Sequence, residues 1–175
     1  MTIKKNKFKW VYRLSGLEKE RVPSFYREQG ILDGVARIMI RRGVDTQDKL
    51  EHFLYDTLDN LTDPFLMKGM EEAVTRIQRA INQKEKIVIY GDYDVDGITS
   101  TAILVRYLMR ENAEVSFYIP SREEEGYGLN QMAVEKLAKA GNRLLVTVDC
   151  GISAADLVAN SPSSMDIIIT DHHQP

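Results

Sequence analysis

The sequence predicts an α/β fold in which a Rossmann-like parallel sheet follows a small, mainly helical N-terminal region. Short runs rich in Val, Ile and Leu alternate with helical segments through the second half of the chain. These runs are apolar at successive positions, which is typical of parallel strands covered by helices on both faces. The expected strands are residues 87–90, 115–119, 144–148 and 166–170, and the expected helices between them are 98–111, 130–140 and 153–160.

Two regions are expected along the chain. Residues 1–57 form the N-terminal region, with a short strand near the start and helical patterning over residues 22–54, within which Gly43 is expected to end a helix. Residues 58–175 form the sheet domain, which opens with turn signals and an amphipathic helix of residues 70–81. For the last helix, Ser153 and Asp156 predict a capping box.

Composition bounds the class of protein. The 175 residues are 43% hydrophobic and 28% charged, which suits a globular protein with one substantial core. No run resembles a signal peptide or is long enough to cross a bilayer, so no membrane association is expected. A single cysteine, Cys150, excludes an intrachain disulfide framework and fits a reducing, cytoplasmic location.

Charge is distributed unevenly between the two halves. Residues 1–86 carry a net charge of +4, whereas residues 87–175 carry −7. Near the start, basic residues alternate with aromatic ones between Lys4 and Arg13, as in surfaces that track phosphates and stack on bases. The favoured explanation of that alternation is a β-strand with one solvent-exposed face. The net positive charge of the first half could still help to hold a polyanion.

Three aspartates directly follow the first expected strand. Asp92, Asp94 and Asp96 stand at alternate positions, so their like charges lie close together and repel. A hard divalent cation such as Mg²⁺ or Mn²⁺ relieves that repulsion. The alternative is a solvated acidic turn. An EF-hand is excluded, because its twelfth position must be a bidentate Glu and is Ile103 here.

Polar residues also follow the other expected strands. In a parallel sheet these residues gather at one edge, where open α/β sheets bind their ligands. They are Ser121 and Arg122 after the second strand, Asp149 after the third, and Asp171, His172 and His173 after the fourth. The mixture of Asp and His favours Mn²⁺ or Mg²⁺ over a structural zinc. Each residue also has a purely structural explanation. Asp149 could start a turn, and Asp171 could anchor a loop by accepting hydrogen bonds from backbone amides.

These motifs resemble a known family. The triplet Asp171-His172-His173 is the signature of the DHH phosphoesterases, and the run Gly91-Asp-Tyr-Asp-Val-Asp-Gly97 is similar to the first motif of the RecJ-type branch, the single-strand-specific DNA exonucleases. The resemblance runs from about residue 58 to the end. Its further segments are Tyr118-Ile-Pro-Ser-Arg122, Glu125-Gly-Tyr-Gly-Leu129, Thr147-Val-Asp-Cys-Gly-Ile152 and Ile169-Thr-Asp-His-His-Gln-Pro175.

The resemblance implies a centre of two Mn²⁺ or Mg²⁺ ions. By that resemblance Asp94, Asp96 and His172 are metal ligands, Asp149 bridges the two ions, and Asp92 has a direct or supporting role. His173 orients the site or contacts the substrate phosphate. Arg122 is the candidate for binding that phosphate, because its planar guanidinium suits phosphate oxygens.

The activity implied is 5′-to-3′ digestion of single-stranded DNA to 5′-mononucleotides, in recombination and repair, with other repair or replication proteins as possible partners. The chain stops two residues after the triplet, whereas the proteins of the family continue. The chain is therefore expected to be an N-terminal fragment with an incomplete DHH domain, and to be weakly active or inactive by itself.

Two alternatives stay open. One is an oligonucleotide or cyclic-dinucleotide phosphodiesterase of the same superfamily, although Tyr90 replaces the histidine usual in those branches. The other is a non-catalytic replication-fork binding module.

Overall fold

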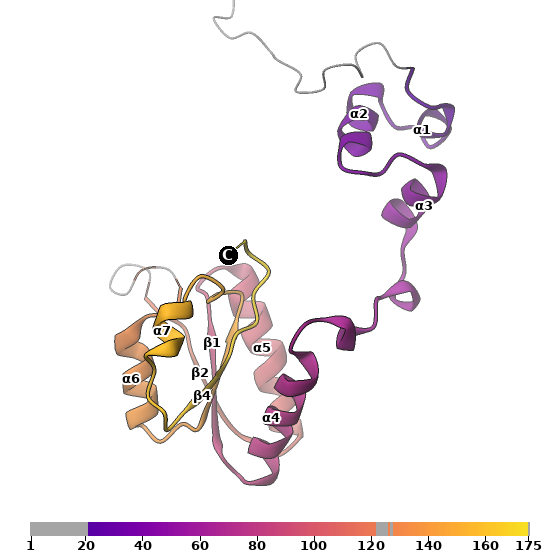
Figure 1. Cartoon of the computed structure of the whole chain (residues 1–175). Helices are drawn as coiled ribbons and strands as arrows, with labels where there is room; N and C mark the ends of the chain where they lie inside the picture. Colours follow the sequence, from indigo (N-terminus) through magenta and orange to yellow (C-terminus); the bar gives the residue numbers. More distant parts are fainter. Residues whose placement is uncertain (1–20, 122–125, 127, 175) are drawn as a thin grey trace, which may run out of the picture. The chain divides into compact units, whose positions relative to one another are not determined.

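The computed structural model describes residues 21–121, 126 and 128–174 (Figure 1). The expected strand near the start of the chain lies outside these residues. The chain divides into two compact units after Asp63, and each is described by itself.

The first unit contains three short helices, and the second of them ends just before Gly43, as expected. They are α1 (Ser24–Glu28), α2 (Asp33–Arg41) and α3 (Gln47–Tyr55), followed by the 3₁₀ turn η1 (Leu58–Asn60). Gly30 and Gly43 interrupt the helices, because each has a positive φ that ends a helical run. The buried residues are Val22, Tyr26, Ala36, Met39 and Leu50. Val35 and Ile38 of α2 are exposed.

The second unit begins with the 3₁₀ turn η2 (Pro64–Leu66) and contains a four-stranded sheet with the order β2-β1-β3-β4. Its strands are β1 (Lys86–Gly91), β2 (Glu114–Tyr118), β3 (Leu144–Val148) and β4 (Asp166–Ile168). Every neighbouring pair is parallel, so the predicted parallel α/β sheet is confirmed. The last strand is shorter than expected.

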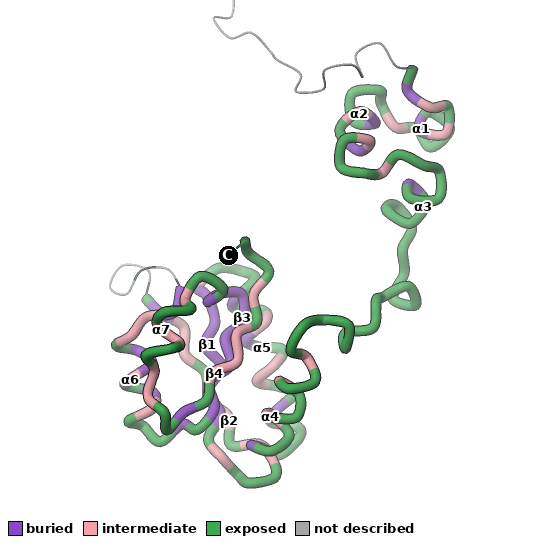
Figure 2. The backbone as a smooth tube through the Cα atoms, viewed as in Figure 1, coloured by how far each residue is buried: buried purple, intermediate pink, exposed green. Residues whose placement is uncertain are grey.

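Helices cover both faces of this sheet (Figure 1). One layer contains α4 (Met70–Asn82) and α5 (Val95–Arg110), and the other contains α6 (Gln131–Lys139) and α7 (Ala155–Ala159). Alternate strand residues supply the two cores. Ile87 and Ile89 pack with Leu108 on the first side, whereas Val88 and Tyr90 pack with α6 on the second. The purple centre of Figure 2 is this doubly covered sheet.

The predicted capping box at the last helix is wrong. The helix α7 starts at Ala155, its N-cap is Ala154, and no side chain caps it. The segment around Ser153 instead forms part of the loop that follows β3. In the part of the chain that the structure describes, no helix has the length and apolar character needed to span a bilayer.

Candidate metal centre

The first part of the site lies between β1 and α5. Asp92 follows β1 and is buried, and Asp94 is the N-cap of α5, where its Oδ1 accepts hydrogen bonds from the Asp96 and Gly97 amides at 3.0 Å each. Gly97 allows the helix to start directly against the loop, since a Cβ there would lie 2.4 Å from the Asp92 carbonyl oxygen. The helix start thus fixes the Asp94 carboxylate beside Asp92.

Asp92 also has an oxygen without a protein partner. Its Oδ1 is buried and receives no hydrogen bond from the described residues. A buried carboxylate oxygen in this condition is costly unless a cation or another donor compensates it.

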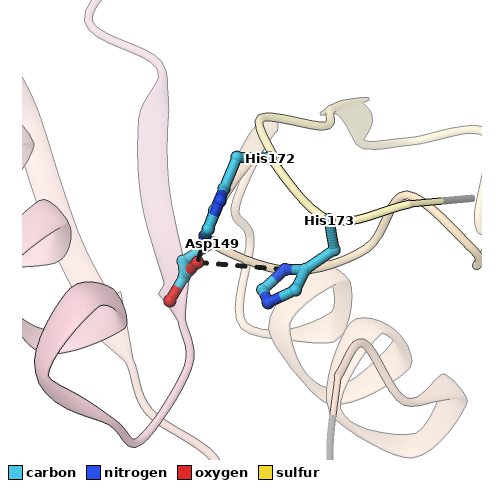
Figure 3. Close-up of side chains that lie close together, drawn as sticks. All are labelled: Asp149, His172 and His173. Atoms are coloured by element: carbon cyan, nitrogen blue, oxygen red, sulfur yellow. Dashed lines mark ion pairs between the residues drawn. The ribbon is translucent and has the colours of Figure 1, made fainter. Parts of the chain in front are cut away.

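The second part of the site lies at the ends of β3 and β4 (Figure 3). Asp149 follows β3 in a left-handed conformation with φ +63°, which Asp adopts more readily than most residues. Its side chain is 4% exposed, and its Oδ1 lies 2.9 Å from His172 Nε2 and 3.9 Å from His173 Nδ1. Neither Asp149 oxygen receives a hydrogen bond of good geometry from the described residues. A buried carboxylate without hydrogen bonds is what a residue that bridges two ions would offer. This supports the bridging role that the resemblance implies for Asp149.

Asp171 holds the loop that carries the two histidines. Its Oδ2 accepts the Ile152 amide at 3.0 Å, its Oδ1 accepts the His173 amide at 3.0 Å, and the same Oδ1 lies 2.7 Å from His173 Nδ1. Burial alone would raise the pKa of Asp171, but these hydrogen bonds outweigh it and the pKa is lowered. The hydrogen bond to Asp171 in turn raises the pKa of His173. Asp171 thus orients His173 and ties its loop to the one after β3.

Electrostatics distinguish Asp149 from Asp94. Burial raises the pKa of Asp149, and the negative charge of Asp94 raises it further, although His172 opposes both effects. The pKa of Asp94 is lowered, chiefly because the Gly97 amide donates a hydrogen bond to its charged form. Of these two carboxylates, Asp149 is therefore the one whose charged form gains more from a nearby cation.

The ligand atoms form two clusters that share Asp149. Asp92, Asp94 and Asp149 form one, and Asp149, His172 and His173 form the other, with the atoms of each cluster within 4.8 Å of one another. Carboxylate oxygens together with imidazole nitrogens suit Mn²⁺ and Mg²⁺. The unsatisfied oxygens of Asp92 and Asp149 are the atoms that two such ions would compensate. The residues present therefore fit a pair of divalent ions.

Two of the predicted site residues stand apart from these clusters. Asp96 is exposed in the first turn of α5 and belongs to neither cluster, although it lines a cavity of about 900 Å³ that Asp149 and His172 also line. Its role as a ligand stays a prediction. Arg122 lies outside the described residues, so its role as a phosphate ligand stays a prediction as well.

The anchoring residues were missed or left open by sequence reasoning. The sequence leaves open whether Asp171 is a ligand or a loop anchor, and in the structure it accepts the Ile152 and His173 amides and anchors the loop. Thr147 of β3 and Thr170, just after β4, hydrogen-bond to each other and carry no signal by type or spacing. Only the predicted parallel order of the strands could have placed them side by side.

Comparisons with known proteins identify the family. The model of the DHH family, N-terminal domain, matches residues 86–175. The single-stranded-DNA-specific exonuclease RecJ of Bacillus subtilis is 42% identical over 171 residues, which is 97% of this chain and 22% of that protein. The enzyme of the same name from Thermus thermophilus is 44% identical over 110 residues, covering 62% of this chain and 16% of that protein. The chain thus spans about a fifth of the length of these relatives.

Solved structures are similar as well. A crystal structure of exonuclease RecJ bound to manganese has a TM-score of 0.55 and 42% identity, covering 62% of this chain and 28% of that one. RecJ from Thermus thermophilus in complex with Mn²⁺ has a TM-score of 0.56 and 29% identity, covering 87% of this chain and 21% of that one. The predicted resemblance to the RecJ-type branch is thereby confirmed, and the chain belongs to the DHH family.

Proposed function

We propose that this chain supplies the metal centre of a single-stranded-DNA-specific exonuclease that hydrolyses phosphodiester bonds with the help of two Mn²⁺ or Mg²⁺ ions. The observation that carries the proposal is the pair of ligand clusters joined by Asp149. The names of its relatives and their manganese-bound structures support the same activity. Digestion from the 5′ end to 5′-mononucleotides is the finer part of the proposal and rests on the motif resemblance.

The carboxylates at the edge of the sheet would bind the two metal ions. Asp92 and Asp94 would hold one ion with Asp149, and His172 would hold the other with Asp149. When bound, such ions supply a hydroxide nucleophile at neutral pH and neutralise charge that develops on the phosphate. Because the Asp149 side chain is buried, its carboxylate lies among the ligand atoms of both clusters rather than in water.

His173 is the residue placed to contact the scissile phosphate. Its Nδ1 lies 2.7 Å from Asp171 Oδ1, which favours the proton on Nδ1 and fixes the plane of the ring. It is half-exposed and lines a cavity of about 730 Å³ with Gly151 and Leu129. With its raised pKa, His173 is suited to donate a hydrogen bond to a phosphate oxygen or to stabilise negative charge there. Arg122 is proposed as a second phosphate contact.

Tyr90 favours the nuclease branch over the cyclic-dinucleotide alternative. It occupies the position at which sister branches have a histidine. Its hydroxyl donates to the Gly128 carbonyl at 3.0 Å and accepts from Asn130 Nδ2 at 3.2 Å, and its ring stacks on Tyr118. These contacts give Tyr90 a packing role in the core under α6.

We further propose roles in recombination and repair, contacts with other repair or replication proteins, and a cytoplasmic location. The motif resemblance supports the first two. The single cysteine supports the third, because Cys150 is a buried free thiol, as expected in a reducing compartment.

The test is Mn²⁺-dependent release of mononucleotides from 5′-phosphorylated single-stranded DNA, together with calorimetric titration of Mn²⁺ into the chain. Asp149→Asn should abolish both release and tight ion binding. Glu111→Gln, which removes an exposed carboxylate at the end of α5 outside both clusters, is the matched control. Equal Mn²⁺ binding by the unchanged chain and Asp149→Asn would contradict the proposal.

A further inference from the structure

Two threonines join β3 and β4 where their backbone pairing is interrupted. The paired residues are Leu144 with Asp166, Leu145 with Ile167, and Val146 with Ile168. Just beyond the last pair, the Thr170 amide donates to Thr147 Oγ1 at 3.1 Å, and Thr170 Oγ1 donates to the Thr147 carbonyl at 2.6 Å. We call these two hydrogen bonds the threonine clamp.

The threonine clamp replaces one bond of the parallel ladder. If the register continued, the Thr170 amide would donate to the Thr147 carbonyl itself. Here each backbone group binds the hydroxyl of the other residue instead. The two hydroxyls thus stand between the strands. Thr147 is fully buried, so water has no access to take the place of its hydroxyl.

Normal pairing returns one step further, at the site itself. The Asp149 amide donates to the Thr170 carbonyl at 3.1 Å. The next link is the hydrogen bond from the Ile152 amide to Asp171 Oδ2. The threonine clamp is therefore the first of three successive links between the loop that carries Asp149 and the loop that carries His172.

Packing around the clamp leaves little room for adjustment. A Cβ at Gly151 would lie 3.4 Å from Thr147 Oγ1 and 3.0 Å from Ile169 Cδ1. Gly151 has φ +106°, a conformation that other residues rarely adopt. The loop after β3 consequently closes directly over the clamp, and a change in the gap between the strands would move Asp149 relative to His172.

We infer that Thr147 and Thr170 are positioning residues that set the distance between Asp149 and His172, and thereby the affinity of the cluster Asp149, His172 and His173 for a divalent ion. This inference rests on the proposed function. The cluster Asp92, Asp94 and Asp149 takes two of its three ligands from β1 and α5, so it depends less on the gap between β3 and β4.

The test is Thr147→Val, which keeps the shape of the side chain and removes its hydroxyl. Mn²⁺ titration should show one binding step weakened by roughly 10- to 100-fold, the usual cost of losing a group that orients a metal ligand, with a smaller change in the other step. His172→Gln identifies which step belongs to the histidine cluster. Thr170→Val should act on the same step, and Thr147→Ser, which keeps the hydroxyl, should restore it.

Thr101→Val is the matched control. Thr101 is also buried, but it lies in α5 and its hydroxyl has no hydrogen-bond partner among the described residues. Its replacement should leave both binding steps unchanged. Amide hydrogen exchange without metal gives a second readout, because Thr147→Val should speed exchange at Thr170 and Asp149 and leave the amides of β1 protected.

The outcomes separate the inference from the proposed function. Unaltered Mn²⁺ binding in both Thr147→Val and Thr170→Val would overturn the inference while the proposed metal centre stands. Equal weakening of both steps, or an equal effect of Thr101→Val, would also overturn it. Failure of the unchanged chain to bind Mn²⁺ would overturn both.

Discussion

The two halves of the candidate metal centre are built in different ways. The half that contains Asp92 and Asp94 is local: both residues lie in one short loop, and backbone amides of the adjoining helix α5 hold Asp94. The half that contains Asp149 and His172 is assembled from residues far apart in the sequence, after two neighbouring strands. Hydrogen bonds that the Thr147 and Asp171 side chains accept from backbone amides hold this second half.

This difference has a functional meaning. A helix start holds its cap residue as long as the helix exists, so the first half is as stable as α5. The second half depends on the distance between the ends of β3 and β4. It also depends on Asp149, whose backbone is in the left-handed conformation. Asp149 alone belongs to both halves, and its loss should therefore have the largest effect.

Replacing Asp149 with Asn should remove tight binding of both ions. Asn tolerates the left-handed conformation, so the fold should persist. Because the pKa of Asp149 is raised, its ionised form costs stability in the metal-free chain, and that cost is absent in the variant. The melting temperature of the metal-free variant at neutral pH should equal or exceed that of the unchanged chain, as measured by circular dichroism. A clearly lower melting temperature would show that the Asp149 charge serves the fold.

Single replacements in one half should separate the two ions. Asp94→Asn keeps an N-cap oxygen for α5 and removes the charge, so it should weaken one Mn²⁺ step by at least about 100-fold, more than is typical for a group that only supports a ligand. His172→Gln should weaken the other step. Calorimetric titration measures both. If each variant weakened the same step, the division into two halves would be wrong.

The far end of β4 should affect stability without affecting the ions. Arg76 of α4 lies 2.8 Å from Glu85 and 2.6 Å from Asp166 at the start of β4, and its side chain is 14% exposed. Arg76→Met should lower the free energy of unfolding by about 1–3 kcal/mol, because it leaves Glu85 unpaired in a largely buried position. Denaturant unfolding measures this change, and Mn²⁺ affinity should stay constant.

Arg79→Met is the control for that prediction. Arg79 lies 3.3 Å from the same Asp166, but both side chains are more than half exposed. The change in unfolding free energy should stay below about 0.5 kcal/mol. A similar loss in both variants would mean that Arg76 acts only as a surface charge.

The smallest expected effect is a pH dependence at the His173–Asp171 pair in the metal-free chain. Folding raises the pKa of His173, so its contribution to stability is present below about pH 6.5 and lost as pH rises through the raised value. Folding lowers the pKa of Asp171, so its contribution is lost as pH falls below about 4. The melting-temperature difference between the unchanged chain and His173→Gln should peak between these limits. A difference that grew above pH 8 would contradict the assignment.

The sequence places the three aspartates of the local half in one loop but does not say which of them share a cluster, since Asp96 stands apart from Asp92 and Asp94. The assembled half could be predicted only in outline. Alternation of apolar runs with helical segments predicts the parallel sheet, and the order of strand ends predicts that Asp149 and the histidines meet. Three features depend on the register between β3 and β4, which no local pattern specifies. They are the left-handed backbone conformation of Asp149, the anchoring of the loop by Asp171, and the threonine clamp. Gly30 and Gly43 divide the expected helical stretch because a positive φ at each ends a helical run.

The central claim is that Asp149 joins two ion sites, and electron paramagnetic resonance of the chain with two bound Mn²⁺ ions tests it most directly. A shared carboxylate should couple the spins of the two ions, so the unchanged chain should show the signal of a coupled pair. Asp149→Asn should lose that signal. A spectrum of two independent Mn²⁺ ions in the unchanged chain would contradict the claim.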